Sequence, residues 1–196
     1  LCFIPVVQLF VTPVLVHENL SLSGVCGVMA VVLGSYILNL KTWSETLLPF
    51  KTIFEEKSIL MMLAVAVIWG VSSSFHKLGI QMTNALFWGV TEIGLIILIL
   101  FPFVFLSEKQ NKKKQLFSKL VLKKATMPAL FSSVAVLSYY MAIGIGPVAY
   151  VSSVRRLGVL LSMLSGIILF KEKFSRLAFS GGMIMIAGAL IITLFG

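Results

Sequence analysis

Aspartate is absent from this sequence, and acidic residues of any kind are few. The 196 residues contain seven acidic residues against sixteen lysines and arginines, and charged residues make up only 12% of the chain. The absence of aspartate excludes aspartyl intramembrane proteases and metal clusters built on aspartate. The only histidines are His17 and His76, and the chain has no HExxH, GxSxG or cysteine cluster. We therefore expect neither an enzyme nor a bound metal or cofactor.

Cysteine is also scarce, whereas apolar residues are in large excess. Cys2 and Cys26 both lie in apolar stretches and define no disulfide framework. The chain is 59% hydrophobic, and its mean hydropathy is +1.05. Soluble domains are about half apolar and about a quarter charged, so the surplus must face lipid. The sequence predicts an integral membrane protein whose net charge of +9 contacts membrane lipids rather than nucleic acid.

Seven apolar runs predict membrane-spanning helices. They cover residues 1–16, 21–40, 59–80, 84–107, 125–144, 147–170 and 177–195. The chain starts with Leu inside an apolar run, so we expect the first helix to be truncated. The predicted fold class is an all-α, polytopic helix bundle.

Basic residues gather on one face of the predicted bundle. The link 41–58 holds three, the link 108–124 holds seven, and the link between the last two helices holds three, thirteen in all. Lys77 is the only basic residue at the opposite face, and the remaining two, Arg155 and Arg156, lie within a span. The positive-inside rule therefore predicts that the links are cytosolic and that the C-terminus lies outside, in a multi-pass protein of the plasma membrane.

An internal repeat relates the two ends of the chain. Residues 17–40 align without a gap to residues 171–194, at an offset of 154. Matched pairs are Glu18 with Glu172, Ser21 with Ser175, Gly27 with Gly181, Met29 with Met183 and Gly34 with Gly188. Glycines at this spacing are also consistent with close helix packing in general.

The repeated helices lie five spans apart, so they should cross the membrane in opposite directions. Inverted repeats of this kind are typical of secondary transporters. We expect residues 1–40 to be the last two helices of a first repeat, 41–58 a cytosolic linker, and 59–196 a complete second repeat of five helices. The intact protein should then have ten helices.

Three segments resemble the drug/metabolite transporter superfamily in its ten-helix form of two EamA domains. They are AVIWGVSSSFHKLGI, YYMAIGIGPVAYVSSVRRLGVLLSMLSGIILFKEKFS and GGMIMIAGALII. The resemblance implies a secondary transporter of small metabolites, with four helices of each repeat lining a central cavity and the fifth outside. Two positions depart from the family pattern: Glu92 replaces a common arginine, and Ala85 replaces a proline seven residues earlier.

Ionisable side chains within spans are the strongest functional candidates. Glu92 and Arg155 each lie eight residues from the same predicted membrane boundary, roughly 12 Å deep, and could meet. The candidate substrate site comprises Glu92, Arg155, Arg156, Trp69, Ser73, His76, Lys77, Tyr139 and Tyr140, with Gln8 a weaker candidate.

Each candidate also has a structural interpretation. Glu92 and an arginine could form a static ion pair, and His76 and Lys77 could extend to the membrane interface. The tyrosines could belong to an interfacial belt, and Trp69 could simply pack.

The function predicted is secondary transport of a small-molecule metabolite by alternating access. The alternative within the same fold is a flippase for a lipid-linked substrate. A seven-helix receptor or retinal protein is a weaker alternative, because the repeat predicts ten helices and the helix at 177–195 has no lysine for a retinal Schiff base. A homodimer is compatible with the sequence.

Overall fold

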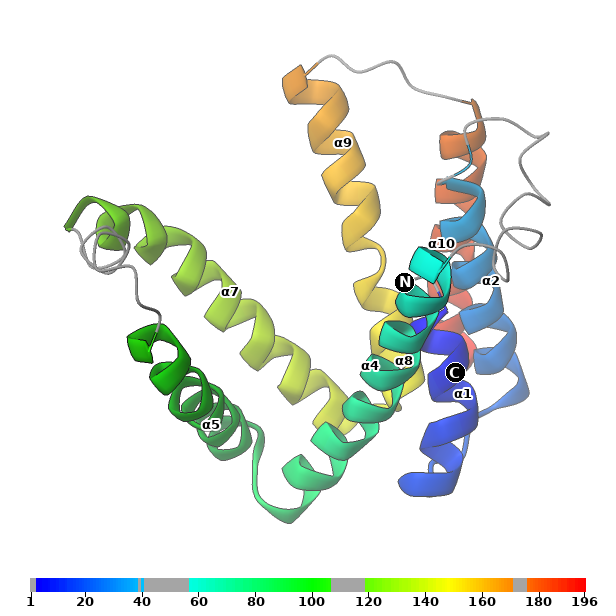
Figure 1. Ribbon diagram of the computed structural model, residues 1–196. Coiled ribbons are helices and arrows are strands. Elements are labelled where there is room, and N and C mark those ends of the chain that lie inside the picture. The colour runs from blue at the N-terminus through cyan, green and yellow to red at the C-terminus, as the bar shows by residue number, and fades with distance from the viewer. Residues whose placement is uncertain (1–2, 39, 41–56, 107–118, 171–175) are drawn as a thin grey trace. The chain divides into compact units, whose positions relative to one another are not determined.

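The computed structural model describes residues 3–38, 40, 57–106, 119–170 and 176–196 (Figure 1). Within these residues the chain forms helices and no strands, which confirms the predicted all-α class. The helices are α1 (Ile4–Leu15), α2 (Leu22–Leu38), α4 (Lys57–Met82), α5 (Ala85–Leu106), α7 (Lys119–Ile145), α8 (Val148–Arg155), α9 (Gly158–Phe170) and α10 (Arg176–Phe195). Most of the predicted linker 41–58, Cys2, Glu172, Ser175 and the lysines of 108–118 lie outside the described residues.

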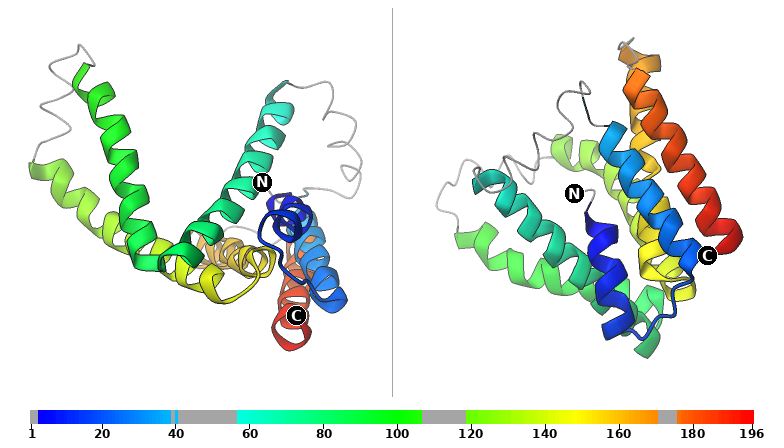
Figure 2. Two further views of the ribbon diagram at one scale, coloured as in Figure 1. Left: turned by 90° about the horizontal axis from the view of Figure 1, so that it is seen from below. Right: turned by 90° about the vertical axis from the view of Figure 1, so that its right-hand side faces the viewer.

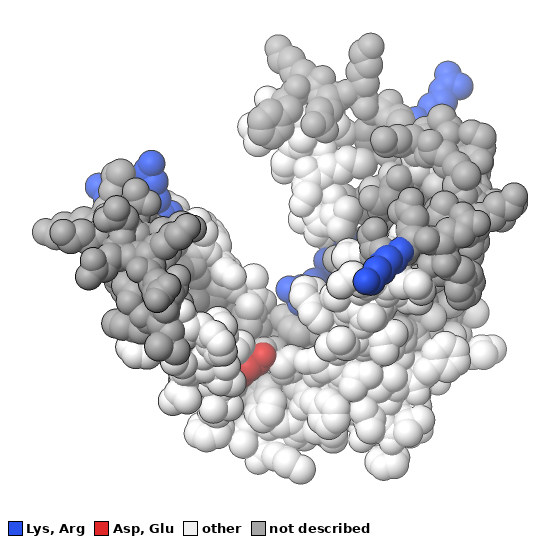
Figure 3. Space-filling model, in the orientation of Figure 1, with Lys and Arg blue, Asp and Glu red and all other residues white. Residues whose placement is uncertain are grey.

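Five stretches are long and apolar enough to cross a membrane. They are Ile59–Met82, Ala85–Phe103, Lys123–Ile145, Val148–Leu169 and Arg176–Phe195, while α1 and α2 are apolar but shorter. Every residue of α5 from Ile93 to Phe103 is exposed, and uncharged side chains dominate the surface in Figure 3. So large an exposed apolar surface is unfavourable in water and suits contact with lipid.

The chain packs as two units. The first consists of Leu1–Phe75 and Gly146–Gly196, and the second of His76–Ile145. The first unit therefore holds α1, α2, α8, α9, α10 and the beginning of α4, and the second holds the end of α4 with α5 and α7.

Within the first unit, α2 and α10 lie side by side (Figures 1 and 2) and meet through glycines. A Cβ atom added to Gly27 would lie 2.8 Å from the carbonyl oxygen of Gly188, and one added to Gly34 would lie 2.6 Å from that of Gly181. Only glycine allows two backbones to approach this closely. Because the residue numbers rise along α2 while those of the contacting glycines fall along α10, the two helices are antiparallel.

The glycine contacts also follow the internal repeat. In the sequence alignment Gly27 is equivalent to Gly181 and Gly34 to Gly188, whereas in the structure Gly27 contacts Gly188 and Gly34 contacts Gly181. An exchange of this kind is what a two-fold axis between two equivalent surfaces produces. The opposite directions predicted for these two helices are thus confirmed.

The core of the first unit lies where α2 and α10 meet α8 and α9. It contains apolar side chains from all four helices: Val28, Val31, Val32, Ala149, Tyr150, Leu160, Met185, Ala189 and Ile192. α8 is thereby fixed against the antiparallel pair.

The start of α2 and the start of α8 cap each other. The Glu18 carboxylate accepts a hydrogen bond from the backbone N–H of Val148, at 3.2 Å from each oxygen. The Tyr150 hydroxyl in turn accepts one from the N–H of Ser21 at 2.9 Å, and the Ser21 side chain accepts one from the N–H of Gly24, also at 2.9 Å. The first N–H groups of a helix have no partner within the helix, so these bonds stabilise both ends.

The span predicted over 147–170 is confirmed as Val148–Leu169, but its helix is interrupted at residues 156–157, which the sequence did not predict. Backbone hydrogen bonds shift to the tighter i to i−3 pattern, with Arg156 N–H bonded to Ser153 O at 3.0 Å and Leu157 N–H to Val154 O at 2.9 Å. Two local features favour the break. The Ser153 hydroxyl donates to the carbonyl of Ala149 at 2.7 Å, a bond that bends helices, and Gly158 has a weak helical preference.

The second unit is held together where α5 packs against α4 and α7. A Cβ atom on Gly79 would overlap the ring of Trp88, so glycine lets the indole lie on α4. A Cβ atom on Gly89 would lie 3.2 Å from the Tyr140 ring. The Asn84 side chain accepts a hydrogen bond from the N–H of Phe87 at 2.8 Å and so caps the start of α5.

Candidate functional site

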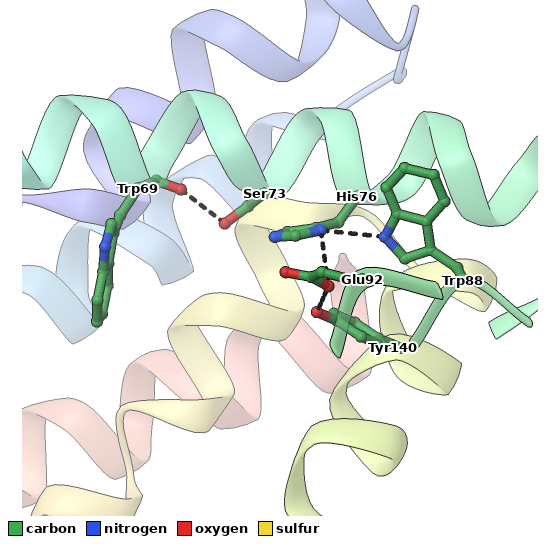
Figure 4. A network of polar contacts seen from close by, with 6 residues as sticks. All are labelled: Trp69, Ser73, His76, Trp88, Glu92 and Tyr140. Atoms are coloured by element: carbon green, nitrogen blue, oxygen red, sulfur yellow. Dashed lines mark hydrogen bonds and ion pairs between the residues drawn. The ribbon is translucent and has the colours of Figure 1, made fainter. Parts of the chain in front are cut away.

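Four polar side chains from three helices meet in the second unit (Figure 4). His76 comes from α4, Trp88 and Glu92 from α5, and Tyr140 from α7. The indole N–H of Trp88 donates to His76 Nδ1 at 3.1 Å, and the Tyr140 hydroxyl donates to Glu92 Oε2. The same carboxylate oxygen lies 3.5 Å from His76 Nδ1. We call these four residues the polar cluster.

The helical repeat and two glycines explain why the polar cluster forms. Trp88 and Glu92 are four residues apart, so they lie on the same face of α5. Gly79 allows the Trp88 ring to approach α4, and Gly89 allows the Tyr140 ring to approach α5. The cluster therefore depends on small residues at two helix contacts as well as on its own polar groups.

The polar cluster is partly open. Tyr140 is buried at 6% exposure, whereas the side chains of His76 and Glu92 are 20% and 26% exposed. The His76 ring is packed between two aromatic rings, with centroids 5.3 Å from Tyr140 and 6.2 Å from Trp88. A carboxylate and an imidazole with this access can bind a proton or a polar ligand.

Residues 56–194 match the EamA-like transporter family. The chain belongs to this family. Its members are membrane transporters of the drug/metabolite type, which confirms the resemblance found in the sequence. No curated protein and no solved structure matches the chain. This EamA-like protein is an integral, multi-pass membrane protein, and the matched residues include the whole polar cluster and the interrupted helix.

Two of the predicted site residues of the EamA-like chain lie further along the same side of α4 as His76 (Figure 4). Trp69 and Ser73 precede His76 by seven and three residues, which places all three on one helix face. The Ser73 hydroxyl donates to the carbonyl of Trp69 at 2.8 Å. Trp69 itself is 58% exposed, so most of its side chain is not covered by protein.

Two further candidates adjoin the polar cluster. Lys77 follows His76 on α4 and is only 6% exposed, so its side chain is covered by protein. Tyr139 is half-buried, and its ring centroid lies 5.9 Å from that of Tyr140. The substrate-binding roles of Lys77 and Tyr139 stay predictions.

The arginines of the EamA-like chain lie at the helix interruption. Arg155 is the last residue of α8 and is exposed, and Arg156 caps that helix and is half-buried. Both belong to the first unit, whereas Glu92 belongs to the second. The contact between Glu92 and an arginine stays a prediction, and the partners that the second unit itself provides for Glu92 are Tyr140 and His76.

Sequence reasoning missed Trp88 and did not foresee three orphaned polar groups. The signal for Trp88 was its indole N–H, which needs an acceptor when it lies in an apolar span. In the first unit Gln8, Thr12 and Ser74 are fully buried, and their side-chain polar atoms have no hydrogen-bond partner among the residues that the structure describes. Gln8 is thus buried between helices, in an apolar setting that makes unpaired polar groups costly.

Proposed function

We propose that this protein is a secondary transporter, rather than an enzyme, which moves a small polar metabolite across the plasma membrane by alternating access. The polar cluster is the observation that carries the proposal. An ionisable side chain in a membrane span costs about 2.5 to 3.5 kcal/mol on insertion scales, so such residues are usually functional. In the polar cluster, Glu92 and His76 are partly exposed, so they can exchange protons with water and can be reached by a ligand.

Two features of the first unit support alternating access. The antiparallel, two-fold related packing of α2 and α10 is the arrangement expected of an inverted repeat, which allows equivalent inward-open and outward-open states. The interruption between α8 and α9 provides a short 3₁₀ segment within a span, a feature that often marks a hinge.

The charge of the interrupted helix favours a substrate that carries a carboxylate. Arg155 and Arg156 are adjacent, and consecutive helical residues point about 100° apart. We propose that these two arginines attract the anionic group of the substrate.

The proposal is tested by uptake into vesicles. Full-length protein is reconstituted into liposomes and supplied in turn with radiolabelled amino acids, hydroxy acids, dicarboxylates and sugars. We expect saturable uptake of at least one carboxylate, with at least a tenfold loss in Glu92→Gln. Thr91→Val, a change of the exposed neighbouring residue on α5, serves as the matched control and should retain uptake.

Two results would contradict the proposal. One is the absence of saturable uptake for every compound, although the reconstituted protein is folded. The other is translocation of a fluorescent lipid-linked sugar in the same vesicles without uptake of any free metabolite, which would favour the flippase.

A further inference from the structure

The structure places two competing partners beside a single nitrogen atom of His76. We propose that His76 Nδ1 is a proton-operated switch: without a proton it accepts from Trp88, and with a proton it donates to Glu92. The inference rests on the proposed function, to which it adds a proton as the coupling ion.

The two contacts of Nδ1 require different protonation states. Trp88 Nε1–H is only a donor, so Nδ1 must offer its lone pair to accept from it. An ionised Glu92 is only an acceptor, so Nδ1 must carry a hydrogen to bond with it. One ring nitrogen holds either a lone pair or a hydrogen in the ring plane, and therefore the two hydrogen bonds exclude each other.

The distances show which of the two states the structure represents. The Trp88 Nε1 to His76 Nδ1 distance of 3.1 Å is that of a hydrogen bond. The 3.5 Å between His76 Nδ1 and Glu92 Oε2 is too long for a strong charged bond, which would be about 2.7 to 2.9 Å. We therefore assign the structure to the unprotonated state, in which Nδ1 accepts from Trp88 and Glu92 accepts from Tyr140.

Protonation needs only a small movement, because both partners already flank the same atom. A proton from water binds the Nδ1 lone pair, the bond from Trp88 breaks, and the new N–H points to Glu92 Oε2. The polar cluster changes from one negative charge to a neutral ion pair, and release of the proton reverses each step. Other titratable groups near His76 are Tyr139 and Tyr140 on α7 and Lys77 on α4.

The switch acts on the contact between two helices. Trp88 lies near the start of α5, with its ring against Gly79 near the end of α4. While Nδ1 is unprotonated, the indole bond joins the two helix ends. On protonation this bond is replaced by the one to Glu92, which lies one turn further along α5. The polar contact between α4 and α5 thus shifts by one helical turn, which links proton binding to a change of conformation.

The first test follows His76 by nitrogen NMR. His17→Asn leaves His76 as the only histidine of the described chain; His17 has a φ of 56°, which asparagine tolerates well. In nanodiscs, the ¹⁵N-histidine signals of the full-length protein that are lost in His76→Gln should show an unprotonated Nδ1 at high pH and two protonated nitrogens at low pH. A neutral form that carries its hydrogen on Nδ1, or the lack of any titration, overturns the switch.

A second test follows Trp88 by fluorescence. In a Trp43→Phe, Trp69→Phe background, the emission of Trp88 should change with pH, because the hydrogen bond of its indole is lost on protonation. We expect His76→Gln to abolish this change and Thr91→Val to leave it intact. A pH response that persists in His76→Gln overturns the switch.

Transport measurements separate the two proposals. With a carboxylate that the vesicles take up, an inward proton gradient should change the initial rate several-fold, and His76→Gln should remove that dependence. An uptake rate that does not depend on the proton gradient contradicts proton coupling but agrees with the proposed function. Absence of any uptake contradicts the proposed function, while the two spectroscopic results still decide the switch.

Discussion

The Glu92 carboxylate lies in a helix that is otherwise apolar, and the Tyr140 hydroxyl satisfies one of its oxygens. Tyr140 is itself buried, so water cannot easily replace its hydroxyl. The hydrogen bond therefore stabilises the contact of α5 with α7. Its loss should reduce stability as well as transport.

We predict that Tyr140→Phe lowers the free energy of unfolding by about 1 kcal/mol, since hydrogen bonds within membrane proteins contribute about that much. The measurement is unfolding of the purified protein in mixed detergent micelles. Thr91→Val removes a hydroxyl from an exposed residue of α5 and should change stability by less than about 0.5 kcal/mol. Equal effects of the two changes would count against a specific bond to Glu92.

We also predict unequal effects of the two arginine substitutions. Arg155 is exposed at the end of α8, whereas Arg156 is half-buried in the turn that follows. Arg156→Ala should mainly lower stability, because it removes a half-buried side chain from that turn, and Arg155→Ala should mainly lower transport with expression intact. Thermal unfolding and vesicle uptake are measured for both, and two variants that behave like the parent would contradict the prediction.

The sequence predicted the chemistry of the candidate site better than its contacts. Glu92, His76 and Tyr140 could be selected as site candidates because polar side chains in an apolar span are costly and are usually functional. The partner predicted for Glu92 was an arginine at matched depth, which stays a prediction, and the sequence did not indicate the two partners within the second unit, Tyr140 and His76. Counting residues along a helix gives depth, but it does not tell which side chains of neighbouring helices face each other.

At the scale of helices, apolar length predicted where the spans lie but missed the interruption between α8 and α9. The break depends on a serine side chain that bonds to the backbone and on a glycine two residues beyond Arg156. An average of hydropathy over the apolar run does not distinguish these two residues from their neighbours. The antiparallel direction of α2 and α10, by contrast, followed from the repeat because it depends only on the number of spans between them.

The contact between α2 and α10 gives a direct prediction for glycine. In Gly27→Ala the new methyl group would lie 2.8 Å from the carbonyl oxygen of Gly188, so the backbones must separate and stability should fall by about 1 to 3 kcal/mol. Gly94→Ala on α5 is the matched control, because no atom lies within 4 Å of the added carbon. It should raise stability by roughly 0.5 to 1 kcal/mol through helix propensity. Unfolding in detergent measures both, and equal effects would contradict the packing described.

At the scale of the whole molecule, the charge distribution predicts the orientation in the membrane. The thirteen basic residues of the three links should be cytosolic and the C-terminus outside. In a full-length background with Cys2 and Cys26 replaced, single cysteines at positions 112 and 196 should differ in labelling by an impermeant thiol reagent on intact cells. We expect labelling at 196 only; labelling at 112 with protection at 196 would reverse the orientation while leaving the repeat intact.

The glycine pairing of α2 with α10 sets an order of events during synthesis. α2 ends at Leu38 and its partner begins at Arg176, so the ribosome must add well over a hundred residues before the two can meet. At about 5 to 20 residues per second this takes roughly 7 to 28 s. During that time the close-packing face of α2 has no α10 to contact, and the second unit, which lies between them in the sequence, is synthesised first. The first unit is therefore completed only after the second unit has left the ribosome.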